Sequence, residues 1–158
     1  MHQKSIIILV IIFIIVLALT DCGTGIRNMD ELADDGKYHY QNKRLGFAIN
    51  LPSEFQYYQT QRKNTDYYID IEFFVPTSDE TYPQEVPGYA KSILVRIMSR
   101  DAWESVEDNE EYSSIFQKIG DKGDKVYTIV FWDKIPTDWQ DKWGEKLKDE
   151  IVESFDIN

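Results

Sequence analysis

The sequence predicts an α+β fold, in which a single domain is built from a twisted antiparallel sheet packed against helices. Several segments alternate apolar and polar residues with a period of two, as half-buried strands do. Near the end of the chain, large apolar residues recur every four positions, as they do on an amphipathic helix. We assign residues 37–158 to this domain, 23–36 to a linker and 1–22 to an export segment.

The first two strands form a predicted hairpin. Residues 38–40 are followed by a polar turn at 41–44, and residues 45–51 then alternate apolar with small or polar side chains. Pro52 ends the second strand because proline has no N–H for the ladder. A third extended piece runs through Tyr57 and Tyr58, and we place the next turn at 62–64.

The remaining strands are predicted from the same alternation. They span residues 67–75, 91–98, 115–120 and 125–132, the last two forming a hairpin. Asp70 and Glu72 share the outer face of their strand with aromatic residues, so a helix or loop is expected to cover part of that face. Residues 125–132 are apolar on both sides and predict a central strand.

Two helices are predicted from capping-box spacings. Asp101 and Glu104 place a short helix over residues 102–111, and Thr137 with Gln140 starts the final helix. The apolar stripe of the final helix consists of Trp139, Trp143, Leu147, Ile151, Val152 and Phe155. Trp143 lies in the middle of this stripe and is expected to be largely buried.

The N-terminal segment predicts export. Lys4 precedes an apolar run of fourteen residues, Ile6 to Leu19. A helix of that length spans about 21 Å, which is short of a hydrocarbon core of roughly 30 Å. A secretory signal fits this pattern. An uncleaved anchor oriented by Lys4 and release by an ordinary signal peptidase are the alternatives, and each of them also exports the domain.

The end of this run resembles the lipobox of bacterial lipoproteins, with Leu19 three residues before Cys22, the only cysteine in the chain. Asp21 stands where that family has a small residue. The resemblance implies lipidation of Cys22, cleavage before it and attachment to the extracytoplasmic side of a cell membrane. Residues 23–36, with three glycines and few bulky apolar residues, are expected to be a flexible, solvated spacer. A cation site is the alternative for its acidic residues, Asp30, Glu31, Asp34 and Asp35.

Two segments of the domain resemble PsbP-like proteins. Residues 46–52 are similar to the opening motif of that family, and residues 151–155 to the close of its C-terminal helix. Phe55 stands where the family usually has tryptophan. The resemblance covers residues 38–155 and implies an α/β/α sandwich that acts by binding protein partners.

The charge of the chain excludes some partners. The net charge is −11, and the one lysine and one aspartate of the first 22 residues cancel, so the exported part carries all of it. Such a surface repels nucleic acid and anionic lipid headgroups. Apart from the membrane that holds the N-terminal anchor, the expected partner is a protein or another envelope component.

The sequence offers little for catalysis, and we expect neither an enzyme nor a bound cofactor or metal. His39 is the only histidine outside the export segment, and a surface or cross-strand role fits it better than that of a base. Glu107, Asp108, Glu110 and Glu111 indicate a solvated helix end, or at most a weak calcium site. A carboxylate-based extracytoplasmic hydrolase is the alternative to a binding module, since glycoside hydrolysis needs only two acids.

The loop at residues 76–88 is the candidate contact with a partner. It is long for a compact domain and contains three prolines. Tyr82 lies between Glu80 and Glu85, and a restrained loop with an amphipathic tyrosine suits an interface. A stiff connection between two strands is the alternative.

Overall fold

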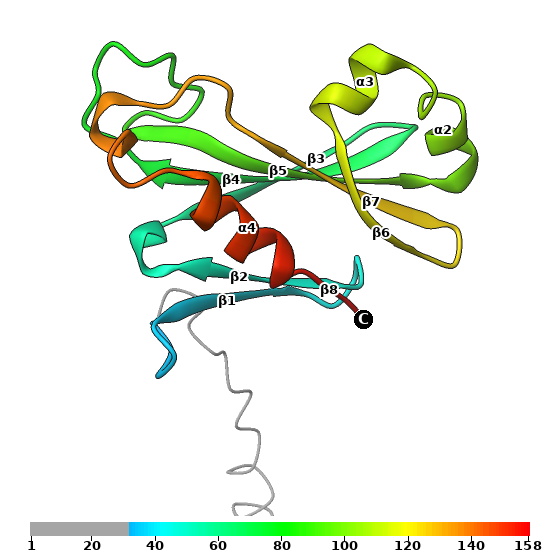
Figure 1. Ribbon diagram of the computed structural model, residues 1–158, viewed down its shortest axis with the longest axis horizontal. Helices are drawn as coiled ribbons and strands as arrows, with labels where there is room; N and C mark the ends of the chain where they lie inside the picture. The colour runs from blue at the N-terminus through cyan, green and yellow to red at the C-terminus, as the bar shows by residue number, and fades with distance from the viewer. Residues whose placement is uncertain (1–31) are drawn as a thin grey trace, which may run out of the picture.

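The computed structural model describes residues 32–158 and contains two antiparallel sheets (Figure 1). The larger sheet has the strand order β3-β4-β5-β7-β6, and the smaller has the order β1-β2-β8. The strands are β1 (Lys37–Asn42), β2 (Phe47–Pro52), β3 (Gln59–Asn64), β4 (Tyr68–Pro76), β5 (Tyr89–Ser99), β6 (Gln117–Lys122), β7 (Lys125–Phe131) and β8 (Asp156–Ile157).

The helices are short and lie on both faces of the larger sheet. They are η1 (Ser53–Phe55), α2 (Arg100–Glu104), α3 (Glu110–Ile115), η2 (Thr137–Trp139) and α4 (Glu145–Glu153). Figure 1 shows α2 and α3 together at one end of the larger sheet, and α4 between that sheet and the smaller one. The residues 32–158 thus form a single domain of mixed α and β structure, compatible with the predicted α+β class.

The main core lies between the two sheets. Alternate residues of β4, β5 and β7 point inward and meet the aromatic residues of β1 and β2. The Tyr40 ring lies 5.0 Å from that of Phe73, and the Phe47 ring 6.3 Å from that of Tyr127. Ile151 of α4 completes this core without exposure to solvent.

The outer face of the larger sheet is only partly covered by helices. Met98 and Val126 pack there against Trp103 of α2, with Tyr112 of α3 beside them. Asp70 and Glu72 are buried on this face, at 5% and 2% exposure. The sequence predicted a mixed outer face with partial cover, and this is confirmed.

Most strands lie where the alternation placed them, and β7 has a strand on each side, as predicted for residues 125–132. The single predicted sheet is wrong, because the first hairpin forms a separate sheet with β8. That strand has two residues, too few for a pattern. Gly46, at φ +81°, passes so close to the chain end that Asn158 N donates to its carbonyl oxygen at 3.0 Å.

The predicted turn at 62–64 is also wrong. Arg62 and Lys63 lie within β3, an exposed edge strand, where charged side chains are common. The turn comes at Thr65, whose Oγ1 accepts from the backbone N–H groups of Tyr67 and Tyr68. A hydroxyl that hydrogen-bonds its own backbone two or three residues on stabilises a turn.

Both capping-box predictions are wrong in position. Ser99 caps α2 through its hydroxyl, and Asn109 caps a separate helix, α3, so residues 102–111 are not one helix. The last helix begins at Glu145 because Gly144 is extended, with φ −165° and ψ 175°. Nevertheless Trp139, Trp143 and Ile151 are buried as predicted.

The export segment and most of the linker lie outside the described residues, and this includes Cys22. Residues 33–37 form a hydrogen-bonded turn next to β1, in which Gly36 N donates to the Ala33 carbonyl at 2.9 Å. Within residues 32–158 no helix is long and apolar enough to cross a membrane.

Candidate functional site

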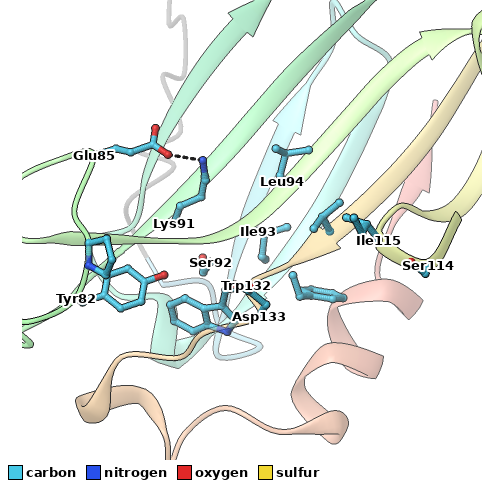
Figure 2. Close-up of a pocket in the computed structure, with 13 residues that line it drawn as sticks. Tyr82, Glu85, Lys91, Ser92, Ile93, Leu94, Ser114, Ile115, Trp132 and Asp133 are labelled. Atoms are coloured by element: carbon cyan, nitrogen blue, oxygen red, sulfur yellow. Dashed lines mark hydrogen bonds and ion pairs between the residues drawn. The ribbon is translucent and has the colours of Figure 1, made fainter. Parts of the chain in front are cut away.

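A groove of about 480 Å³ opens on the outer face of the larger sheet (Figure 2). It exists because β6 pairs with β7 only as far as Ile129, while β7 continues to Phe131. The residues before β6 form α3 and do not extend the sheet. Within residues 32–158, the end of β7 therefore has no paired strand on the side where β6 lies. The groove lies between α3 and the loop that follows β4.

Four segments line the groove. The lining residues are Tyr82, Pro83 and Glu85 of the loop, Lys91, Ser92, Ile93 and Leu94 of β5, Ser114 and Ile115 of α3, and Val130, Phe131, Trp132 and Asp133 at the end of β7. Leu94 and Val130 are paired across the two strands and form the floor. Ser92 is placed by a bulge between Phe73 and Phe74, and its hydroxyl donates to the Phe73 carbonyl at 3.1 Å.

A network of four charged side chains joins the groove to the neighbouring strands. Lys91 donates to Glu85 Oε1 at 2.6 Å and to Glu72 Oε1 at 3.1 Å. Lys63 of β3 also donates to both acids, at 3.0 and 3.1 Å. Its Nζ lies 2.8 Å from Oε2 of Glu72 without hydrogen-bond geometry, so that contact is an ion pair only. The buried Glu72 is thereby neutralised by two lysines.

The network shifts the pKa values of Glu85 and Lys91. Hydrogen bonds from Lys91 and Lys63 lower the pKa of Glu85. Burial acts to lower the pKa of Lys91, but the hydrogen bonds to Glu85 and Glu72 offset it and raise that pKa. Both groups are therefore charged over the whole physiological range.

The loop that carries Tyr82 is held in place by the segment after β7. Asp138 accepts from the hydroxyl of Thr77 at 2.7 Å and from the backbone N–H of Ser78 at 2.9 Å. Asp79 accepts in return from the N–H of Thr137 at 3.0 Å, and Trp139 Nε1 donates to the Pro76 carbonyl at 2.9 Å. The loop is thus a fixed wall of the groove.

The opposite wall is the end of α3. Ser114 and Ile115 both line the groove, and Ile115 is 51% exposed. Glu111 precedes them by three and four residues, so it lies on the same side of this helix. An exposed isoleucine next to an exposed carboxylate gives this wall an amphipathic character.

Two of the three predicted contact residues meet at the groove. Tyr82 is half-buried and, like Glu85, lines it, while Glu80 is exposed and does not. Sequence reasoning missed Lys91, Trp132 and the α3 wall. The alternation predicts a strand at Ile115, and only the separate cap at Asn109 indicates that a second helix reaches this residue.

The other candidate residues do not form a site. His39 Nδ1 lies 2.6 Å from Asn50 Oδ1 on the opposite strand, a cross-strand contact, and its Nε2 lies 3.1 Å from Asp35. The acidic residues at 107–111 are divided between a turn and α3. Across residues 32–158 no group of three or more His, Cys, Asp or Glu side chains is arranged to hold a metal ion.

Comparison of the chain with protein families, curated proteins and solved structures finds no match.

Proposed function

We propose that this chain is a membrane-tethered extracytoplasmic lipoprotein whose domain is a non-catalytic binding module, with the groove as its contact surface. The observation that carries the proposal is the groove itself. It combines an apolar floor, half-exposed aromatic and aliphatic walls and a few charged groups, which is the usual make-up of a binding site.

The rigidity of the walls supports binding. The loop is tied down by Asp79, Asp138 and the ion pairs of Glu85. Because little conformational entropy is then lost on association, a larger part of the contact energy appears as affinity. Tyr82 presents a ring and a hydroxyl to the groove, as interface tyrosines commonly do.

A carboxylate-based hydrolase has less support. Its general acid needs a raised pKa, so that the carboxyl stays protonated until it reacts. The pKa of Glu85, one of the two acids that line the groove, is lowered by two lysines. Glu85 is therefore ionised and not suited to donate a proton.

We also propose that the domain is a variant of the PsbP-like α/β/α sandwich, tethered through a lipid on Cys22. The supports are the residue 46–52 and 151–155 motifs, together with short helices on both faces of an antiparallel sheet. Export follows from the apolar run of the first 22 residues.

A pair of adjacent serines provides the test. Ser114 lines the groove and Ser113 does not, yet both are exposed and each donates to the carbonyl of the residue three positions earlier. Tryptophan at position 114 should fill the groove, while tryptophan at 113 adds the same bulk outside it.

The experiment compares envelope proteins recovered with the full-length protein in non-ionic detergent, quantified by mass spectrometry. A partner should be lost with Ser114→Trp and retained with Ser113→Trp. Equal recovery with both variants, each folded as judged by circular dichroism, would remove the groove as the contact surface.

A further inference from the structure

The groove carries a net negative charge. Two carboxylates line it, Glu85 and Asp133, against the single ammonium of Lys91. Lys91 is already shared between Glu85 and Glu72, so it offers little attraction to an anion. Asp133 is exposed, and among residues 32–158 it accepts only from the N–H of Lys134. A cation that approaches this end of the groove finds a free carboxylate.

An acidic residue also stands beside the other end of the groove. Glu111 does not line the groove, but it precedes Ser114 and Ile115, which do, by three and four residues, so it lies next to them on the same side of α3. No basic residue lies between Asp101 and Glu111, and that stretch contains six acidic residues. The basic side chains next to this stretch, Arg96 and Lys118, are already paired with Asp70 and Asp121. The exposed carboxylates therefore attract a lysine or arginine more than an anion.

Between the two acidic ends lies an apolar floor. Leu94 and Val130 are half-buried, and the exposed Ile115 overhangs them. Among residues 32–158, no strand pairs with β7 beyond Ile129 on the side where β6 lies, although β5 still pairs with it on the other side as far as Phe131. An extended chain segment could lie along this edge with an apolar side chain on the floor.

We propose that the groove binds an extended, cationic segment of a protein, in which an apolar residue is flanked by lysine or arginine. The apolar residue sits on Leu94 and Val130, and the basic residues reach Asp133 at one end and Glu111 at the other. This inference rests on the proposed function, because it assumes that the groove is the contact surface, and adds the chemistry of the partner.

The test uses three fluorescein-labelled synthetic peptides of equal length: alternating Lys and Leu, alternating Glu and Leu, and alternating Lys and Ser. Binding to the full-length protein in non-ionic detergent is measured by fluorescence anisotropy. The Lys–Leu peptide should bind at least roughly tenfold more tightly than either of the others, since it alone satisfies both the charge and the floor.

Charge-reversal variants locate the contact. Glu111→Lys with Asp133→Lys should weaken Lys–Leu binding roughly tenfold and reduce its dependence on salt. The matched control is Asp66→Lys with Asp156→Lys, which changes net charge equally at exposed positions in the β3–β4 turn and in β8. That control should leave binding nearly unchanged.

Three results would overturn the inference: no binding of the Lys–Leu peptide, equal binding of the Glu–Leu peptide, or equal weakening by both double variants. Failure here is separable from failure of the proposed function. If the Glu–Leu peptide binds and Ser114→Trp blocks it while Ser113→Trp does not, the groove stands as contact surface and only the cationic partner is wrong.

Discussion

Arg96 and Asp70 lie directly opposite each other on β5 and β4, and the guanidinium donates two hydrogen bonds of 2.8 Å to the carboxylate. Their side chains are only 12% and 7% exposed. The guanidinium also lies between two rings, 3.6 Å from the centre of Tyr68 and 4.4 Å from that of Phe116. The guanidinium of this ion pair thus holds Phe116, the residue between α3 and β6, against the outer face of the sheet.

Breaking this pair from one side should be costly. Arg96→Met leaves a buried carboxylate without its partner, and we expect a loss of about 3–5 kcal/mol in the free energy of unfolding. Urea denaturation measures it. Arg62→Met, on the exposed edge strand, is the control and should change stability by less than about 0.5 kcal/mol. If the two variants are equally stable, the pair contributes nothing to the fold.

Removing both charges should be far milder. In Asp70→Leu with Arg96→Met, no uncompensated charge remains, so most of the loss should be recovered. A double variant as unstable as Arg96→Met alone would mean that the ring contacts of the guanidinium, and not its charge pairing, hold this region together.

The strands could be predicted because the alternation of side chains within each one indicates which of its faces points into the core. In residues 69–75 the odd-numbered side chains belong to the main core and the even-numbered ones do not, and residues 93–97 alternate in the same way, so a period of two is enough. The stripe from Trp139 to Ile151 is equally real, but a repeat of four cannot show that Gly144 interrupts it. Burial was therefore predicted correctly where the helix boundary was not.

The site could be predicted only in part because its members are brought together by strand register. Lys63, Glu72, Glu85 and Lys91 come from three strands and a loop, and no local pattern pairs them. Tyr82 was accessible to sequence reasoning since its loop is long and rich in proline. The groove itself depends on where β6 stops, which follows from the position of α3.

Acid should break the contacts that Glu85 and Asp138 make with their neighbours and so release the loop at residues 76–88. Hydrogen bonds from Lys91 and Lys63 hold the pKa of Glu85 below its ordinary value of 4.5. Burial acts to raise the pKa of Asp138, but hydrogen bonds from Ser78 and Thr77 offset it and keep that pKa below 3.8. A lowered folded-state pKa gives stability that is present above the unfolded value and lost as pH falls through the folded one. The contacts of Glu85 and Asp138 together clamp the loop, and this clamp should therefore persist at neutral pH and weaken below these pKa values.

Nuclear magnetic resonance can follow this release at single amides. The Ser78 N–H, which donates to Asp138, should titrate with a midpoint below 3.8. Asp138→Asn should abolish that step and leave the Thr137 N–H, which donates to Asp79, still titrating. A Ser78 midpoint at or above 3.8 would contradict the clamp.

Trp143 should be a major contributor to stability. It is 7% exposed, and its ring lies 4.9 Å from Trp132, 5.6 Å from Phe131 and 6.3 Å from Phe55. Trp143→Ala should cost about 3–5 kcal/mol in urea denaturation. Its buried Nε1 has no hydrogen-bond partner within residues 32–158, so Trp143→Phe should cost much less. A loss below about 1 kcal/mol for the alanine variant would place this residue outside the core.

Cys22 should carry the membrane anchor. Mass spectrometry of the mature protein is expected to show a diacylglyceryl-modified cysteine at the N-terminus, and Cys22→Ser should leave the precursor unprocessed. Asp21→Gly should speed processing, because it restores the small residue of the lipobox. An intact Met1 in the membrane fraction would instead establish an uncleaved anchor.

Variants at Tyr82 and Glu80 distinguish a partner contact in the groove from a contact at the tip of the loop. Tyr82 lines the groove, and Tyr82→Ala should weaken binding of the Lys–Leu peptide by at least about 1 kcal/mol, roughly fivefold, as removal of an interface aromatic does. Glu80 is exposed and outside the groove, so Glu80→Lys should have little effect on either binding or melting temperature.

These two variants also decide which part of the loop takes part in the contact. If Glu80→Lys weakens binding as much as Tyr82→Ala while both proteins stay folded, the partner touches the loop tip, and a groove-centred contact is wrong. If Tyr82→Ala binds normally, the loop is only a stiff connection between β4 and β5. The contact would then be confined to the floor and the α3 wall, where Ser114→Trp should still block it.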